Sequence, residues 1–106
     1  MYKKAFFIGI VTTEVIVKEI NGKKLCKFTI AGNDKNAQGE SVPQYFHCTA
    51  WNHNATFMEN YVRKGMNMFV EAEPIYKQFE DAQKNKRNNI EFDVIDMRFA
   101  DGKKDN

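Results

Sequence analysis

Two stretches of this chain, residues 24–31 and 45–52, alternate apolar and polar side chains with a period of two. This is the period of a β-strand that buries one of its faces. The residues that the alternation assigns to the core are small or apolar, namely Cys26, Phe28, Ile30, Phe46, Cys48 and Ala50. The pattern therefore predicts a β-protein whose second and third strands each contribute one face to a common core.

Further strands are predicted on either side of these two. Residues 2–20 are rich in Ile, Val, Phe and Thr, and we expect them to form one long strand that bends sharply at Gly9. Asn21 and Gly22 predict a tight hairpin turn into the second strand, because both residues tolerate a positive φ. Residues 66–72 and 90–99 are predicted as the fourth and fifth strands. Pro74 is expected to end the fourth strand or to place it at a sheet edge.

One short helix is expected between the third and fourth strands. Apolar side chains in residues 55–64 recur at helical spacing, namely Phe57, Met58, Tyr61 and Val62. Asn54 is the expected N-cap, and Gly65 is expected just after the helix. The predicted order is three strands, one helix and two strands. Five strands are too few for a sandwich, and one helix is too few for an alternating α/β fold. The order predicts an all-β fold, a five-stranded OB-fold barrel with one short helix between strands 3 and 4.

The chain length allows a single domain. Its 106 residues, of which 42% are hydrophobic, can fill one modest core. We expect this domain to occupy residues 1–100, followed by a short disordered tail at 101–106. Residues 32–44 and 79–89 are polar and without period, and we predict long loops there. No apolar run approaches the ~20 residues of a membrane span, so no membrane association is expected.

The distribution of charge is more informative than the net charge of +2. Residues 1–35 carry seven lysines against three acidic residues, and residues 77–89 carry four basic residues against two acidic ones. Such concentrations favour an anionic partner. Cys26 and Cys48 lie in predicted strand interiors and are interpreted as buried, reduced residues of a cytoplasmic protein.

The third predicted strand carries the main candidate binding site on its outward face. Tyr45, His47, Thr49 and Trp51 share this face, on the part of an OB barrel where single nucleic-acid strands usually lie. Bases stack on aromatic rings without regard to sequence, at ~1–3 kcal/mol per base. In the alternative interpretation, these aromatic residues cap the barrel or form a subunit interface.

A second group of candidates follows the fourth strand. Tyr76 and Phe79 could extend the aromatic surface, and basic residues lie among and after them. Their cations could replace the counterions of phosphate groups, which would make binding depend on salt. The predicted basic contacts are Lys77, Lys84, Lys86 and Arg87, with Lys4 and Lys35 as weaker candidates. Alternatively, this segment is a solvated loop whose lysines provide solubility.

No catalytic, metal or cofactor site is predicted. His47, Cys48 and His53 are close in sequence, but the first two should point to opposite faces of a strand, and no pair has the spacing of a zinc site. Ser41 is the only serine and lies in a predicted loop without a nucleophile elbow. The acidic pairs in the later strands are attributed to strand solubility rather than to a nuclease site. The sequence therefore indicates a binding protein and not an enzyme.

Over nearly its whole length, the chain resembles the bacterial and phage single-stranded-DNA-binding protein family. The resemblance is carried by residues 4–9, by residues 21–31 and by an ungapped run from Tyr45 to Phe79 that contains Trp51. It implies binding of single-stranded DNA with little sequence specificity, which protects the DNA during replication, recombination or repair. It also implies that Tyr45, Trp51 and Phe79 are the stacking aromatics.

The resemblance further implies self-association, as a homotetramer that wraps DNA across its subunits or as a dimer. Two departures from the family pattern stand out. Residues 32–36 contain no aromatic residue, which implies reduced affinity or wrapping. No disordered linker or acidic tail follows residue 102, so recruitment of replication proteins through such a tail is not expected. The chain is interpreted as a short member from a phage or mobile element, or as a truncated piece of a longer protein.

Two other functions remain open from the sequence. The first is a dimeric primosomal replication protein with the same fold, which would explain the missing tail. The second is an OB-fold adaptor in which the face that carries Tyr45 and Trp51 binds another protein, as exposed aromatic residues often do.

Overall fold

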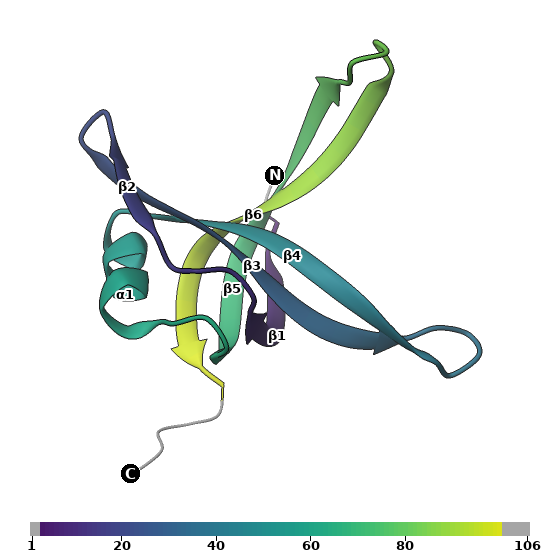
Figure 1. Cartoon of the computed structure of the whole chain (residues 1–106), viewed down its shortest axis with the longest axis horizontal. Coiled ribbons are helices and arrows are strands. Elements are labelled where there is room, and N and C mark those ends of the chain that lie inside the picture. The colour runs from purple at the N-terminus through teal and green to yellow at the C-terminus, as the bar shows by residue number, and fades with distance from the viewer. Residues whose placement is uncertain (1–2, 101–106) are drawn as a thin grey trace.

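The computed structural model describes residues 3–100 and contains six strands and one helix (Figure 1). The elements are, in chain order, β1 (Ala5–Val11), β2 (Val17–Ile20), β3 (Lys23–Lys35), β4 (Ser41–Trp51), α1 (His53–Tyr61), β5 (Asn67–Glu80) and β6 (Lys86–Phe99). The tail predicted at residues 101–106 lies outside the described residues.

Five of the strands close into a barrel. Their order is β1-β5-β6-β4-β3, and β3 then pairs with β1 at Ile10 and Val11 to complete the circle. The pairing of β4 with β6 is parallel, and the other pairings are antiparallel. Of the described strands, β2 pairs with β3 alone and extends the hairpin outside the barrel. The predicted five-stranded OB-fold barrel with one helix is confirmed, and the helix lies between β4 and β5.

The prediction of one long first strand is wrong, because this part of the chain forms two separate strands, β1 and β2. Two threonines in the intervening segment bind the backbone of Thr29 on β3. The Thr12 N–H donates to the Thr29 carbonyl at 2.9 Å, and the Thr29 N–H donates to Oγ1 of Thr13 at 3.2 Å. These contacts replace the regular strand pairing between β1 and β2, which lie one after the other along the same edge of β3, opposite β4.

The two predicted long loops are also largely strand. β3 and β4 pair as far as Lys35 and Ser41, and β5 and β6 pair as far as Glu80 and Lys86. The outer parts of these hairpins, residues 32–44 (the β3–β4 arm) and 75–91 (the β5–β6 arm), project from the barrel in different directions (Figure 1). Because both faces of an isolated two-stranded arm are exposed, its residues carry no apolar alternation by which a strand could be recognised.

Pro74 does not end its strand, but lies inside β5 opposite Phe92. The described pairing of β5 with β1 stops at Ala72, so among residues 3–100 Pro74 has a paired strand on one side only. Proline is tolerated at such an edge because no partner needs its missing N–H.

The same kind of turn closes both arms. Oδ1 of Asn36 accepts hydrogen bonds from the backbone N–H groups two and four residues later, at 2.9 and 3.0 Å. Oδ1 of Asp81 does the same, at 3.0 and 2.9 Å. The fourth residue of each turn has a left-handed backbone, Gly39 with φ 80° and Lys84 with φ 65°. Side-chain acceptors of this kind stabilise short loops that cannot bury apolar surface.

The helix begins two residues before the expected position. Its N-cap is Asn52, with a positive φ of 52°, and the Asn52 carbonyl accepts a hydrogen bond from the N–H of Thr56 at 2.9 Å. Asn54, the predicted cap, lies inside the helix. Its side-chain amide donates to the backbone carbonyl of Val94 at 3.3 Å and so ties α1 to β6.

The helix also ends earlier than expected, at Tyr61, because Val62 has an extended backbone. Arg63 and Lys64 therefore follow the helix and are not part of its last turn. Gly65 has a φ of 96°, and its N–H donates to the carbonyl of Val11 at 2.7 Å. It serves the turn that leads into β5 rather than the end of the helix.

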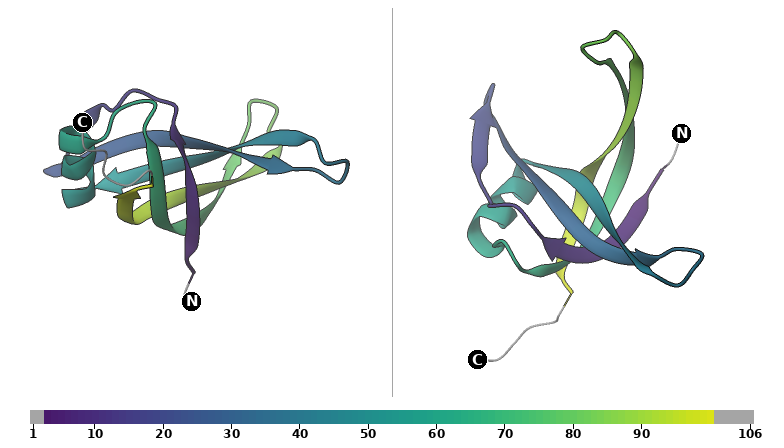
Figure 2. Two further views of the ribbon diagram at one scale, coloured as in Figure 1. Left: turned by 90° about the horizontal axis from the view of Figure 1, so that it is seen from below. Right: turned by 45° about the vertical axis from the view of Figure 1, so that its right-hand side comes forward.

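The core lies inside the barrel and beneath α1, which packs against β3 and β4 (Figure 2). The predicted inward faces of β3 and β4 are confirmed, since Cys26, Phe28, Ile30, Phe46, Cys48 and Ala50 all belong to the core cluster or pack against it. Three partly buried rings, Phe7, Phe46 and Phe92, contact one another with centroid distances of 4.4 to 5.6 Å.

Gly9 lies where β1 crosses closest to β3. A Cβ atom at this position would stand 2.5 Å from the carbonyl oxygen of Ala31 and 2.6 Å from Cγ2 of Ile30. Both distances are well inside van der Waals contact, and one of the neighbours is backbone. A larger residue would therefore push β1 away from β3, next to the two residue pairs that close the barrel.

We predict that Gly9→Ala lowers the free energy of unfolding by about 2 kcal/mol, because the added methyl group overpacks the closure. Chemical denaturation followed by far-UV circular dichroism measures this change. Gly32→Ala is the matched control, since its Cβ would meet nothing closer than the Ile8 carbonyl at 3.4 Å. The control should stay within about 0.5 kcal/mol of the wild type. Equal losses in both variants would contradict the close-approach argument.

Candidate nucleic-acid interface

The outward face of β4 presents its aromatic side chains to solvent. We use the name β4 face for its four residues, Tyr45, His47, Thr49 and Trp51. Tyr45 is 59% exposed and Trp51 is 38% exposed, and the rings lie on the same side of the strand, six residues apart. Six residues of β-strand span about 20 Å. The predicted direction of these two rings is confirmed, because neither enters the core.

His47 lies between the two aromatic residues and is exposed. Its Nδ1 is 3.1 Å from Oγ1 of Thr29, its register partner on β3. This cross-strand hydrogen bond limits the rotation of the imidazole ring. The middle of the β4 face therefore carries an oriented polar group.

Thr49 differs from the expectation of an exposed residue, since it is only 6% exposed. It points outward with the rest of the β4 face, but it lies where β4 meets β6, opposite Asp93. Leu25 on the outward face of β3 is buried in the same region, at 8% exposure. The two residues are covered because the surface here is concave.

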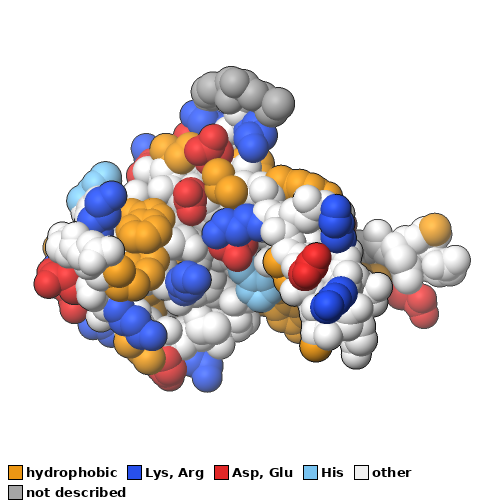
Figure 3. Space-filling model, turned by 90° about the horizontal axis from the view of Figure 1, so that it is seen from above, with side chains coloured by type: hydrophobic (Ala, Val, Ile, Leu, Met, Phe, Trp, Pro, Cys, Tyr) orange, Lys and Arg blue, Asp and Glu red, His pale blue; other side chains and the backbone are white. Residues whose placement is uncertain are grey.

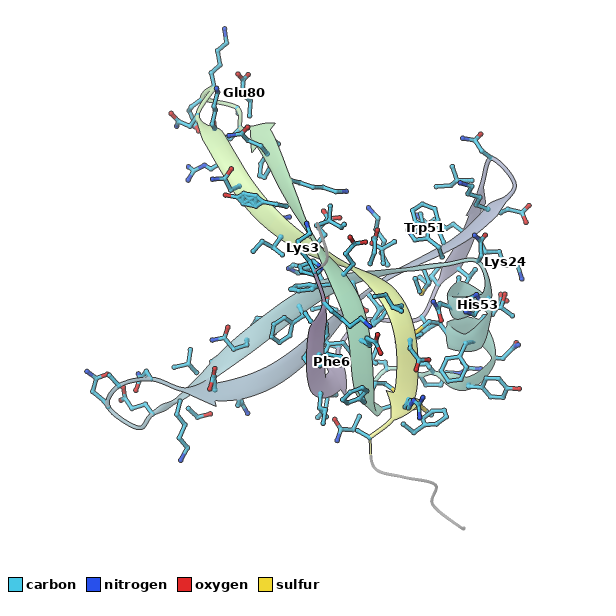
Figure 4. All side chains as sticks on the ribbon, turned by 180° about the vertical axis from the view of Figure 1, so that it is seen from behind. Lys3, Phe6, Lys24, Trp51, His53 and Glu80 are labelled. Atoms are coloured by element: carbon cyan, nitrogen blue, oxygen red, sulfur yellow. The ribbon has the colours of Figure 1, made fainter. Side chains whose placement is uncertain are left out.

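This concavity is a cleft of about 220 Å³ between four strands. Its lining combines apolar, cationic and anionic groups: Leu25, Lys27, Thr49, Trp51, Ile75, Lys77, Glu91 and Asp93. Trp51 lies between the β2–β3 hairpin and the β5–β6 arm, whose tip carries Glu80 (Figure 4). The cleft thus joins one aromatic ring of the β4 face to the base of the β5–β6 arm.

The aromatic residues of the β5–β6 arm are exposed, Tyr76 by 59% and Phe79 by 51%. They occupy opposite faces of the arm, because residues alternate along a strand. Phe79 shares the cleft side with Ile75 and Lys77, whereas Tyr76 faces the other side, opposite Ile90. The structure therefore brings Phe79, but not Tyr76, onto the side of Trp51.

Three of the predicted basic contacts form ion pairs within the protein. Lys77 lies 3.1 Å from Glu91, Arg87 lies 2.9 Å from Asp81, and Lys4 lies 2.6 Å from Glu71. In Figure 3, basic and acidic side chains are interspersed over the visible face and form no continuous basic patch. An anionic partner would have to compete with these carboxylates.

The other basic candidates lie near the tips of the arms. Lys35 belongs to the β3–β4 arm, and Lys84 and Lys86 belong to the β5–β6 arm. All three are exposed, and none of them forms an ion pair within residues 3–100. Their charges are available to an anionic strand that extends from the β4 face toward either arm.

The described side chains of this site do not form a set of metal ligands. His47 and Cys48 point to opposite faces of β4, and residues 3–100 contain no group of three His, Cys, Asp or Glu side chains placed to hold a metal ion. Burial raises the pKa of the Cys48 thiol to about 12 and also raises the pKa of Cys26. Both thiols are free and remain protonated at neutral pH. None of the described helices has the length and hydrophobicity of a membrane span.

The alternation of residues 24–31 leaves Leu25 and Lys27 on the face opposite the core residues, but neither was predicted as part of a site. Ile75, Glu91 and Asp93, which also line the cleft, were not predicted as site residues either. The period-2 pattern of residues 90–94 could have shown that the two acids share a face. Nothing in the sequence indicates that β6 meets β4 there, because residues far apart in the chain form this contact.

Asp81 organises the tip of the β5–β6 arm. Hydrogen bonds from the backbone N–H of Asn85 and from the Arg87 side chain hold the pKa of its carboxyl below the usual value. A lowered pKa means that the ionised carboxylate stabilises the folded turn above the ordinary pKa of aspartate. This stabilisation is lost as the pH falls through the lowered value.

We predict that the Asp81 carboxyl titrates below the ordinary aspartate value of about 3.9. The chemical shift of its carboxyl carbon, followed by NMR as the pH is lowered, measures this. In Arg87→Gln the pKa should rise part of the way back, because the backbone donors remain. A titration of the wild-type group at or above the ordinary value would show that the turn is not formed in solution.

Residues 2–100 match the sequence model of the Single-strand binding protein family. The chain is 27% identical over 106 residues to "Single-stranded DNA-binding protein 1" of Clostridium acetobutylicum, covering 96% of each protein. It is 30% identical over 88 residues to the "Single-stranded DNA-binding protein" of Borreliella burgdorferi, covering 77% of this chain and 58% of that protein.

The fold is similar to a solved structure, the "Plasmodium falciparum SSB complex with ssDNA". The TM-score is 0.81, and the match covers 93% of this chain and 95% of that one. At 19% sequence identity, this likeness concerns the fold.

Proposed function

The chain belongs to the single-strand binding protein family, whose members bind DNA and are not enzymes, and from this we propose how it holds DNA. Unpaired DNA lies along the β4 face, between the β3–β4 and β5–β6 arms. Bases stack on Tyr45 and Trp51, and Phe79 extends the surface along the β5–β6 arm. Bound in this way, the protein protects single strands during replication, recombination or repair in the cytoplasm.

One observation carries this proposal, namely the exposure of two large aromatic rings on one face of a single strand of the barrel. Exposed aromatic rings along one face of an OB-fold strand offer a surface on which unpaired bases can stack. Every base offers a π-face, so stacking on Tyr45 and Trp51 accepts any sequence. The same rings on a duplex would find no unstacked base to contact.

Basic residues supply a second, weaker contribution. Lys35, Lys84 and Lys86 can contact phosphates where the strand passes the arm tips. Lys77 and Arg87 contribute less, because Glu91 and Asp81 already neutralise part of their charge. We therefore propose an affinity that falls with salt, but with a modest slope.

We predict that Trp51→Ala weakens the binding of oligo(dT) by ~1–3 kcal/mol, the contribution of one stacked base. Anisotropy of a labelled oligonucleotide, measured at two salt concentrations, gives the affinity. Trp51 is the only tryptophan, so quenching of wild-type fluorescence reports contact at this ring directly. Tyr61→Ala is the control, since Tyr61 is 58% exposed on α1, away from the β4 face. Unchanged emission and anisotropy in the wild type would refute DNA binding at this face.

We also propose that the chain forms homo-oligomers, a dimer or a tetramer, through the outward face of β1. Phe6, Ile8 and Ile10 on this strand are 58%, 56% and 48% exposed, and Phe6 contacts Phe69 of β5 with a centroid distance of 6.0 Å. Among residues 3–100, β1 pairs with β3 only at its last two residues, so no described strand covers this edge of its earlier part. An apolar strand with an open edge can pair with the same strand of a second copy.

We predict that light scattering gives the wild type a mass that is a multiple of 12.4 kDa, two or four times the chain. Ile8→Lys should reduce this mass, because a charge would be placed in the apolar contact. Tyr61→Lys, at an equally exposed ring on α1, should leave the mass unchanged. A monomeric wild type would exclude this use of β1.

A further inference from the structure

The cleft beside Trp51 is lined in part by acidic side chains, which phosphate binding does not explain. Glu91 and Asp93 both line it, and carboxylates repel a phosphate backbone. Aromatic stacking alone would not require acidic groups at this place. The edge of a base, in contrast, carries N–H donors that a carboxylate can accept.

Thr49 adds a polar group at the same point. It lines the cleft and is only 6% exposed as a residue, and its hydroxyl forms no hydrogen bond with a described residue. Since residues 3–100 contain no buried side-chain nitrogen or oxygen without a partner, this hydroxyl oxygen is open to the cleft. Thr49 and Asp93 are register partners on β4 and β6, so their side chains leave the sheet side by side. A hydroxyl that can donate thus stands next to a carboxylate that can only accept.

The two acidic residues are not equivalent. Glu91 is paired with Lys77 at 3.1 Å, so its charge is partly neutralised. Asp93 forms no ion pair or side-chain hydrogen bond within the described part of the chain. An incoming N–H donor would therefore find Asp93 unoccupied.

We propose that this cleft is a base-reading subsite that favours a nucleobase with an exocyclic amino group, in the first place cytosine. The inference rests on the proposed function, since DNA must first lie along the β4 face. The ring would stack on Trp51, its N4 amino group would donate to Asp93, and the Thr49 hydroxyl would donate to the neighbouring ring N3. Thymine presents the carbonyl O4 where cytosine has N4, and this oxygen would face the Asp93 carboxylate without a proton between them.

The sequence tolerance given by Tyr45 and Trp51 is then incomplete. Most bases of a bound strand are held by stacking alone, but the one that enters the cleft is selected by its edge. Adenine and guanine also carry an exocyclic amino group that can donate a hydrogen bond. Their affinities relative to that of cytosine measure how strongly the size of the cleft discriminates against the larger purine rings.

The test compares oligo(dC) with oligo(dT) of equal length by anisotropy, above neutral pH where cytosine is unprotonated. We expect oligo(dC) to bind about tenfold more tightly, in keeping with the discrimination of a good base-edge contact. In Asp93→Asn this ratio should fall toward one, because an amide can donate to O4 as well as accept from N4. Glu14→Gln is the charge-matched control, located away from the cleft, and should leave the ratio unchanged.

A change in the ligand provides a second test that does not depend on the folding of a variant. Oligo(dC) carrying two methyl groups on each N4 keeps the ring but lacks the N–H donors, and should bind the wild type no better than oligo(dT).

Three results would overturn the inference: equal or tighter binding of oligo(dT), no effect of N4 methylation, or an Asp93→Asn variant that binds both oligomers more tightly by the same factor. The last result would show that Asp93 acts by general repulsion. If the wild type binds neither oligomer, the proposed function itself fails.

Discussion

The barrel depends on the close approach of two backbones at Gly9. β1 can pair with β5 along most of its length and still reach β3 at Ile10 and Val11, because no side chain separates the strands there. Closure of the circle buries the apolar faces of all five strands around one core. It also fixes β4 between β3 and β6, with its other face outward. The surface that carries Tyr45 and Trp51 is thus a consequence of how the barrel closes.

The elements with one buried face could be predicted from the sequence, and the others could not. Cys26, Phe28 and Ile30 lie in the core as their alternation indicates, and the direction of Trp51 follows from the same period. The strands of the two arms were not predicted, because both faces of each arm are exposed to solvent and their residues show no alternation of apolar and polar side chains. The burial of Thr49 was missed because it depends on Asp93, from a strand far along the chain. Period-2 reasoning therefore finds the direction of a side chain but not what lies across from it.

Charge has a more limited part in this surface than the count of basic residues suggests. Lys77 and Arg87 form ion pairs with Glu91 and Asp81. Part of their positive charge is therefore neutralised within the β5–β6 arm and is less available to a bound ligand. In the proposed binding mode, aromatic area and the shape of the cleft therefore provide more of the affinity than counterion release does. The acidic groups near Trp51 give this surface a local chemistry that a uniformly basic groove would lack.

Both prolines of the chain lie in strands of the two projecting hairpins, Pro43 in β4 and Pro74 in β5. At each position the strand has a single neighbour within the described part of the chain, and no described strand pairs with its other edge. Proline is accommodated in a paired strand where its nitrogen faces the open edge, and that edge then lacks one donor. An edge interrupted in this way is a poor template for an extra strand, which protects long, solvent-exposed ribbons from aggregation.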